Sequence, residues 1–503
     1  MCNRPRTASI HILDDDSLLH VFFLYRPFLL GEDQDENAYL WGGDEGWDRG
    51  RWWYKIAHVC RRWRKVILGS ASYLELSLVC ANATPVADML AHSPPLPLVI
   101  DYNSQDITTE DEEAIILALK QCDRVRRIRF ELSFTSLRKI IVAIAEEYPI
   151  LEYMLIELQV EDNDTILRLP ETLQAPRLRH LMLKGFVLPI DSRLFTTAVS
   201  LVTLYLYMDR ASTYFYPNTL LQWLLFMPQL ETLLILFSSP VPNHEVERQL
   251  AQTPIITPIT LLNLHHFTFQ GVSTYLEALI HRITTPRLEK LEILFFHEVA
   301  FFVPRLLQFI NTTENLKFDS VGFGFSDENF VSAFCPHEKF DMYAASILVE
   351  CEHLDWQVSS AAQIFNSLGQ MFSAVEHLTL EHPAHSQSPE EHNPVDRNEW
   401  RKLLCPFSNA KTLHIGDRLV EDLSRCLDLE DGEDPLELLP KLQELAYFGR
   451  GDTDDVFTSF IDARQNADRP VSLVRLSPSP SPDPDSSLSI PQANNEGGSD
   501  RDT

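Results

Sequence analysis

A short pattern of the form LxxLxL, or a near variant of it, recurs along most of this chain and limits the folds open to it. The clear copies are "VRRIRF" at residue 125, "LEYMLI" at 151, "LRHLML" at 178, "LVTLYL" at 201, "LETLLI" at 230, "LHHFTF" at 264, "LEKLEI" at 288, "VEHLTL" at 375, "AKTLHI" at 410 and "LQELAY" at 442. A weaker copy, "LKFDSV", begins at 316. Adjacent copies start 23 to 35 residues apart, so the gap of 59 residues after 316 predicts one obscured unit.

The segments between these strands have helical patterns, and several strands are entered through a proline. In "SLRKIIVAIAEEY" the apolar side chains share one helical face: Leu137, Ile140, Ile141, Ile144, Ala145 and Tyr148. A helix, a proline and a short strand form one unit that cannot bury its apolar face alone, so neighbouring units must stack. The sequence therefore predicts an α/β repeat fold, an irregular leucine-rich-repeat-like solenoid of short parallel strands and helices.

We assign residues 71–476 to this solenoid. Residues 73–102 predict a strand, a helix opened by Thr84 and Pro85, and a second strand. The leucine-rich-repeat template continues with an Asn or Cys that bonds to the backbone of the next repeat. This chain has residues such as Phe186 and Ser238 there, so the repeats are degenerate.

The two ends of the chain are predicted to lack a fixed fold. Residues 1–8 are expected to be flexible. Residues 477–503 are rich in Ser, Pro and Asp, and a segment of this composition cannot bury enough apolar surface to fold. Ser477, Ser479 and Ser481 each precede a proline, and their phosphorylation is a hypothesis.

Residues 9–70 predict a small helical module. "LDDDSLLHVFFLY" places acidic residues at a helix start, followed by the apolar side chains Leu18, Leu19, Phe22 and Phe23. Residues 28–53 interrupt the module with a Gly- and acid-rich stretch that carries half of the eight Trp residues. We interpret this stretch as an inserted loop whose aromatic side chains pack back onto the body, and a partner-binding loop is the alternative.

The segment "AHVCRRWRKVILGS", residues 57–70, predicts a single amphipathic helix. The side chains on one face follow steps of three and four: Ile56, Val59, Cys60, Trp63, Val66, Ile67 and Ser70. The four basic residues fall on the outer face: Arg61, Arg62, Arg64 and Lys65. A nucleic-acid-binding helix is disfavoured because the chain has a net charge of −30 and a pI of about 4.9. A metal site is disfavoured because no second Cys or His lies near in the sequence.

These two segments together resemble an F-box. The family pattern has a Leu-Pro-acidic start, a Leu-Leu-x-x-Phe helix and a helix of the form Val-Cys-Arg-x-Trp. The matching residues are Leu13, Leu18, Leu19, Phe22, Val59, Cys60, Arg61, Trp63 and Ile67. The sequence of residues 55–102 is similar to that of F-box proteins from basidiomycete fungi. This chain departs from the pattern at Asp14, where the family has Pro, and in the insertion at 28–53.

The resemblance implies a function without catalysis by this chain. F-box proteins bind a Skp-type adaptor of a cullin ubiquitin ligase through this module, and their repeats present the target protein. The residues that the resemblance assigns to adaptor binding are Leu13, Leu18, Leu19, Phe22, Val59, Cys60, Trp63 and Ile67. A local core formed by the same side chains is the simpler alternative for several of them. A repeat scaffold with a remnant F-box and no ligase role stays open, favoured by Asp14 and the insertion.

No catalytic, cofactor or metal site is predicted. His265 and His266 are adjacent in a strand and so point to opposite faces. The His-rich stretch 381–393 (His382, His385 and His392) predicts a polar loop, with a zinc site as the alternative. "GFGF" at 322–325 lacks the third Gly of a nucleotide-binding loop. Acidic runs such as "LEDGEDP" are expected to be solvated loops.

The expected location is the cytosol or the nucleus. The eight Cys residues are scattered and form no CxxC pair, which suggests a reducing compartment and mostly buried thiols. The N-terminal residues have no apolar signal core, and no apolar run reaches the roughly 18 residues of a membrane span. No nucleic-acid or membrane partner is expected, and the target protein is left unknown.

Overall fold

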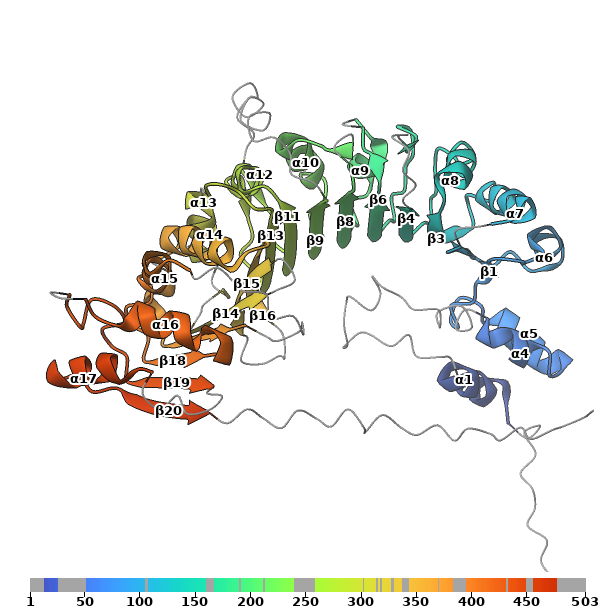
Figure 1. Cartoon of the computed structure of the whole chain (residues 1–503). Helices are drawn as coiled ribbons and strands as arrows, with labels where there is room; N and C mark the ends of the chain where they lie inside the picture. The colour runs from blue at the N-terminus through green and yellow to red at the C-terminus, as the bar shows by residue number, and fades with distance from the viewer. Residues whose placement is uncertain are drawn as a thin grey trace, which may run out of the picture. The chain divides into compact units, whose positions relative to one another are not determined.

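The computed structural model divides into two compact units (Figure 1): residues 1–317 with 334–351 form the first unit, and residues 318–333 with 352–503 form the second. The structure describes residues 13–25, 51–104, 107–159, 167–189, 191–210, 213–238, 258–301, 303–313, 315–316, 319–326, 330–336, 343–369, 371–382, 395–430, 433–448 and 456–476. The Ser/Pro/Asp-rich tail, residues 1–8 and most of the 28–53 insertion lie outside these residues.

The first unit is built on a parallel sheet. Its strands lie in the order β1, β2, β3, β4, β6, β8, β9, β11, β13, β16. Their bounds are Leu78–Cys80 (β1), Leu98–Tyr102 (β2), Val125–Leu132 (β3), Tyr153–Leu158 (β4), His180–Lys184 (β6), Thr203–Met208 (β8), Thr232–Phe237 (β9), His266–Gly271 (β11), Lys290–Phe295 (β13) and Tyr343–Glu350 (β16). Each neighbouring pair is parallel. This order confirms the predicted α/β repeat solenoid for this unit.

Helices and two small strand pairs complete the first unit. The helices of the repeats are α6 (Val86–His92), α7 (Thr109–Leu119), α8 (Phe134–Ile141), α9 (Arg193–Thr197), α10 (Pro217–Leu224), α12 (Ser273–Ile280) and α13 (Pro304–Asn311), and they lie along one face of the sheet in Figure 1. Before them come α1 (Asp15–Tyr25), α4 (Trp52–Ala57) and α5 (Arg61–Gly69). The small parallel pairs are β5 (Leu167–Arg168) with β7 (Phe186–Val187), and β10 (Ile259–Thr260) with β12 (Ile283–Thr284).

The second unit repeats the same architecture on a smaller scale. Its parallel strands are β14 (Ser320–Ser326), β17 (His377–Glu381), β18 (Thr412–Ile415), β19 (Glu444–Phe448) and β20 (Ser472–Leu476). Its helices are α14 (Leu354–Ser367), α15 (Arg397–Leu404), α16 (Val420–Leu427) and α17 (Thr458–Asn466), with the 3-10 turns η3 (Met371–Ala374) and η4 (Asp417–Leu419). One more strand, β15 (Phe330–Pro336), follows β14 in the chain.

A recurrent four-residue turn explains why prolines precede the strands. Before β6, the Leu178 N–H donates to the Ala175 carbonyl over 3.1 Å, with Pro176 as the second residue of the turn. Proline is favoured at that position because its ring presets the φ angle that the turn needs. The same hydrogen bond enters β4, β8, β9, β11, β13, β17, β18 and β19.

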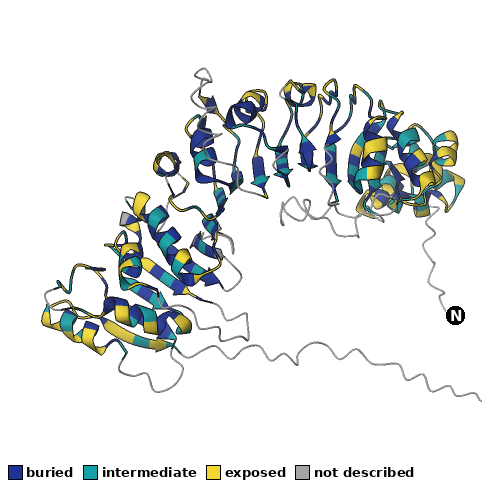
Figure 2. Cartoon of the chain, turned by 45° about the horizontal axis from the view of Figure 1, so that its top comes forward, coloured by how far each residue is buried: buried dark blue, intermediate teal, exposed yellow. Residues whose placement is uncertain are grey.

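The LxxLxL pattern marks the side chains that fill the interior. Its first residue closes the turn, and the other two alternate along the strand toward the helices. In the β6 repeat these residues, Leu178, Leu181 and Leu183, are fully buried. Figure 2 shows buried residues along the strands and exposed residues on the outer sides of the helices. The repeated pattern is therefore the core of the solenoid.

The long gap in the repeat series does contain a hidden strand. On the side away from β11, β13 pairs with β16. The sequence of β16, "YAASILVE", departs from LxxLxL. The weak copy at 316 does not form the next strand of the first unit, because β14 begins only at Ser320 and pairs with β17 in the second unit. The prediction of an obscured unit was correct, and the weak copy at 316 leads into β14, which begins at Ser320.

Three other elements are shorter than predicted. The first strand is limited to Leu78–Cys80 instead of starting at residue 73. The helix after Thr84 starts at Val86, with Pro85 at its cap position. The helix predicted through Tyr148 ends at Ile141, although Ile144 and Tyr148 are buried in the following turn.

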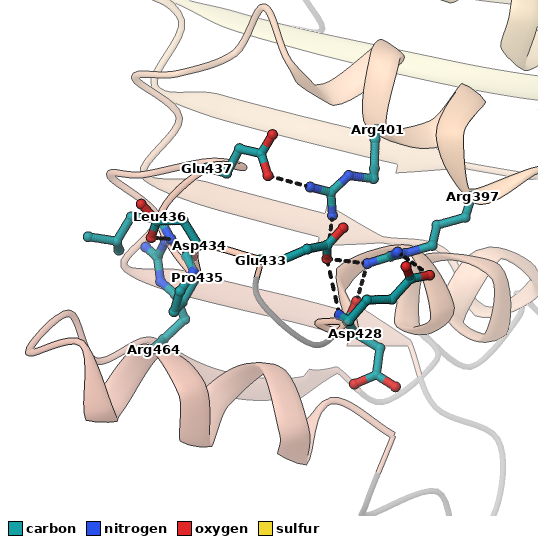
Figure 3. A network of polar contacts seen from close by, with 10 residues as sticks. Arg397, Arg401, Asp428, Glu433, Asp434, Pro435, Leu436, Glu437 and Arg464 are labelled. Atoms are coloured by element: carbon teal, nitrogen blue, oxygen red, sulfur yellow. Dashed lines mark hydrogen bonds and ion pairs between the residues drawn. The ribbon is translucent and has the colours of Figure 1, made fainter.

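The acidic run "LEDGEDP" is more than a solvated loop (Figure 3). Arg397 on α15 lies 2.6 Å from Glu433 and 2.6 Å from Glu430, and Arg401 lies 3.3 Å from Glu433 and 2.8 Å from Glu437. The two arginines of one helix therefore hold the segment that leads into β19. "GFGF" lies inside strand β14, so it forms no nucleotide-binding loop.

Candidate functional site

The segment predicted as one amphipathic helix is two helices. α4 ends at Ala57, the chain turns at residues 58–60, and α5 begins at Arg61. Cys60 is extended, with φ −159° and ψ 171°, and its Sγ accepts from the Trp63 N–H at 3.5 Å. Cys60 therefore caps a helix instead of lying on a continuous apolar stripe, and Val59 projects from the turn with 58% of its surface exposed.

Three of the eight predicted adaptor-binding residues form the interior of this module. Leu18, Phe22 and Ile67 are fully or almost fully buried. The Phe22 and Trp63 rings meet edge to face with their centroids 5.1 Å apart, which joins α1 to α5. The burial of Leu18, Phe22 and Ile67 supports the alternative of a local core for these three residues.

Two of the four basic residues on α5 have structural partners. Arg62 donates through Nε to Asp15 Oδ1 over 2.8 Å and also donates to the Leu13 carbonyl, so it holds the start of α1. Arg64 Nε donates to the Ala57 carbonyl over 3.1 Å at the end of α4. Two side chains of the predicted basic outer face thus form hydrogen bonds to the ends of other helices. Arg61 and Lys65 are exposed.

Asp14, the residue that departs from the F-box pattern, caps α1. Its Oδ1 accepts from the Ser17 N–H over 2.7 Å, and the Leu18 N–H donates to its carbonyl. The hydrogen bond from the Ser17 backbone lowers the pKa of Asp14, so the carboxylate stays charged at the positive end of the helix dipole. Asp14 thus starts the helix without the proline of the family.

Trp53 anchors the helical module to the solenoid. This side chain is buried, and its Nε1–H donates to the Ser77 carbonyl over 3.1 Å, just before β1. Arg51 donates to Thr84 Oγ1 over 2.9 Å in the same repeat. The expectation that aromatics of the insertion pack onto the body is confirmed for Trp53, although Trp52 and Trp53 belong to α4 and not to a loop. Trp41 and Trp47 lie outside the described residues.

The module still presents accessible apolar surface. Of the predicted set, Val59 is exposed, and Leu13, Leu19, Cys60 and Trp63 are half-buried. Large exposed apolar side chains that the prediction left out lie on α1 and after α5: Val21, Phe23, Leu24, Tyr25 and Tyr73. Their signal was present in "VFFLY", because a helix turn that is apolar all round cannot bury every side chain against one neighbour.

The sheet face of the first unit carries titratable groups with shifted pKa values. Burial raises the pKa of Asp101 on β2 to about 6, and Arg129 lies 4.0 Å from its Oδ1. Burial lowers the pKa of His180 on β6 to about 4, and its Nδ1 lies 3.1 Å from Thr203 Oγ1. Asp101 therefore lies beside a charged side chain, and His180 lies beside a hydroxyl group.

The two adjacent histidines have different surroundings. His265 is partly exposed beside Glu289 at 3.6 Å, whereas His266 is buried and lies 3.3 Å from Glu292. Over the described ranges, no group of three or more His, Cys, Asp or Glu side chains could hold a metal ion. His382 is buried, and His385 and His392 lie outside those ranges.

The cysteines that the structure describes are free thiols: Cys60, Cys80, Cys122, Cys335, Cys351, Cys405 and Cys426. Burial raises the pKa of Cys80 and of Cys426 to about 12, so neither supplies a thiolate at neutral pH. Among the described segments, no helix is both long and apolar enough to cross a membrane.

The repeat geometry defines the class of protein: an α/β solenoid of short parallel strands and helices, preceded by three short helices. No protein-family model matches the chain, and no curated protein matches it. Among solved structures, the leucine-rich repeat-containing protein LegL7 from Legionella pneumophila is similar at 9% identity and a TM-score of 0.25, over 78% of this chain and 98% of that one.

Proposed function

We propose that this chain is the substrate-recognition subunit of a Skp–cullin–F-box ubiquitin ligase. The observation that carries the proposal is the exposed apolar surface of the helical module, which includes Val59 between α4 and α5 and the side chains at the end of α1, in the segments that resemble an F-box. Exposed apolar patches of this kind mark interaction sites. Trp53 fixes the module to the first repeat, so a bound adaptor would be held at one end of the solenoid.

The residues divide into two roles under this proposal. Leu13, Leu19, Val59, Cys60 and Trp63 keep accessible surface and would contact the adaptor. Leu18, Phe22 and Ile67 would support that surface from inside. The chain itself would transfer no group and need no cofactor, since the chemistry belongs to the partner enzymes. The complex would work in the cytosol or the nucleus.

Affinity purification from cells tests the proposal. Full-length wild type is expected to bring down a Skp-type adaptor and a cullin, and Val59→Asp to lose both because it places a charge in the apolar surface. Trp63→Ala should lose them too, although it also removes the Phe22 contact. Val142→Asp, at a side chain that is 85% exposed on the repeats, is the matched control and should retain both.

A folded wild type that brings down no adaptor would overturn the ligase proposal. That result would favour a repeat scaffold with a remnant F-box, the alternative suggested by Asp14 and the insertion. Far-ultraviolet circular dichroism of each variant separates a lost contact from a lost fold.

A further inference from the structure

The turns that enter the strands of the first unit form a continuous exposed ridge. On the adjacent strands β6, β8, β9, β11 and β13, the second turn residue is exposed and apolar every time: Pro176, Val199, Pro228, Leu262 and Pro286. The turns follow the parallel register of the strands, which aligns Thr203, Thr232 and His266. The Asn263 Nδ2–H donates to the Pro228 carbonyl over 3.2 Å, which confirms that neighbouring turns are in contact.

The middle of this ridge carries larger side chains than the turn requires. Val199 and Leu262 occupy positions where other repeats have proline, and Leu225 and Phe226 lie just before Pro228. Val199, Leu225 and Phe226 are 44 to 49% exposed, and Leu262 is 58% exposed. Water-exposed apolar groups of this size contribute little to the fold of a repeat, and several side by side mark an interaction surface. We call these four residues, with Pro176, Pro228 and Pro286, the turn ridge.

Arginines lie at both ends of the turn ridge. The third turn residues of the same five turns are Arg177, Ser200, Gln229, Asn263 and Arg287, a row without any carboxylate. Both arginines are exposed. Four strand spacings of about 4.8 Å place their backbones roughly 19 Å apart. The nearest carboxylates in the register lie two positions further on: Glu231, Glu289 and, in the neighbouring β4 repeat, Glu152. Glu289 lies 3.6 Å from His265.

We infer that the turn ridge docks an amphipathic segment of another protein that carries apolar side chains between acidic ends. A helix of about 13 residues spans roughly 19 Å, so its ends can reach Arg177 and Arg287. A second copy of this chain fits poorly, because a two-fold pairing of ridges would bring Arg177 of one copy toward Arg287 of the other. The docking site needs only the repeats, so it does not depend on the ligase proposal.

Two synthetic probes test the site on the full chain. One is a labelled 14-residue helical peptide with leucines on one face and two glutamates at each end, and the other has lysines in place of the glutamates. Fluorescence anisotropy at low salt should show the glutamate peptide binding at least 10-fold more tightly. Leu262→Glu with Phe226→Glu should weaken that binding at least 10-fold. Arg177→Glu with Arg287→Glu should reverse the preference, so that the lysine peptide binds more tightly.

Matched controls keep the test specific. Val299→Glu, at a side chain that is 93% exposed after the end of β13, should leave both affinities unchanged. Adaptor recovery should be the same for Leu262→Glu as for wild type, which separates this site from the helical module. The inference is overturned if wild type binds neither peptide or both equally, or if the charge reversal leaves the preference unchanged. It is also overturned if sedimentation shows a wild-type dimer that Leu262→Glu dissociates.

Discussion

At the scale of single residues, a few buried polar side chains form hydrogen bonds with backbone groups that lie outside the helices and strands of the repeats. Arg464 on α17 is completely buried, and its guanidinium donates to the carbonyls of Pro435, Pro440 and Leu442 over 3.2 to 3.3 Å. It joins α17 to the segment that enters β19 (Figure 3). An apolar side chain of similar length would fill the same space and satisfy none of these acceptors.

Arg464→Met is therefore expected to lower the free energy of unfolding by about 2 to 4 kcal/mol, since buried carbonyls that lose their donors keep the full cost of desolvation. Urea denaturation followed by circular dichroism measures the change. Lys441→Met, at an exposed side chain in the same segment, is the control and should change it by less than about 0.5 kcal/mol. Equal effects of the two changes would show that Arg464 is not a structural clamp.

Asp101 gives a pH dependence with a defined sign. Burial raises its pKa in the fold to about 6, whereas an unfolded Asp has a pKa of about 3.9. As the pH falls from 7 to 4, the folded chain takes up this proton before the unfolded chain does, so wild type gains stability relative to Asp101→Asn. The expected gain is about 1 to 3 kcal/mol, measured by urea denaturation at each pH. Parallel stability curves for the two proteins would contradict it.

At the scale of elements, neighbouring repeats cap one another's helices. Glu277 on α12 accepts from the backbone N–H groups of Arg305 and Leu306 at the start of α13, over 2.9 to 3.1 Å. Glu298 does the same for α12, accepting from the Ser273 Oγ–H over 2.8 Å and from its backbone N–H. These caps replace the local Ser, Thr or Asp caps that short helices otherwise need.

Glu277→Ala should lower the free energy of unfolding by about 1 to 3 kcal/mol, because it leaves two N–H groups at a helix start without an acceptor. Thermal and urea unfolding measure the loss, and Glu277→Gln should recover part of it. Glu352→Ala, at an exposed residue, serves as the control. A loss no larger than that of the control would mean that water replaces the cap.

The elements also show what the sequence could predict. The strands were found from LxxLxL because the same three positions, such as Leu178, Leu181 and Leu183, must face the core in every repeat. β16 was missed because "YAASILVE" fills that space without the pattern. The break between α4 and α5 at residues 58–60 was missed because no Gly or Pro marks it. The break follows from the Cys60 cap and from the hydrogen bond between Trp53 and Ser77. The Trp53 contact joins residues far apart in the sequence, so it leaves no local signal. The turn ridge was missed because Val199 and Leu262 replace the prolines that marked other turns.

At the scale of the whole molecule, the fold is a stack in which each repeat depends on its neighbours. The two units differ in size but use the same turn and the same buried strand positions. Loss of one buried leucine should therefore weaken the adjacent repeats first. Because the stack depends on the buried positions, the exposed residues of the strand-entering turns are free to vary.

Leu204→Ala on β8 removes a fully buried side chain and should cost about 2 to 5 kcal/mol. Hydrogen–deuterium exchange should show the largest loss of protection in β6, β8 and β9 and a smaller loss in β2 and β3. Val142→Ala, at an exposed side chain, should leave exchange unchanged. Uniform loss of protection through the first unit would instead indicate that it unfolds as a single cooperative block.

The most direct test of the account is the affinity of the purified full-length chain for a purified Skp-type adaptor, measured by isothermal titration calorimetry. We predict a one-to-one complex for wild type, at least 10-fold weaker binding for Val59→Asp, and unchanged binding for Val142→Asp and Leu262→Glu. No measurable binding by a folded wild type, or equal binding by wild type and Val59→Asp, would contradict the proposed function.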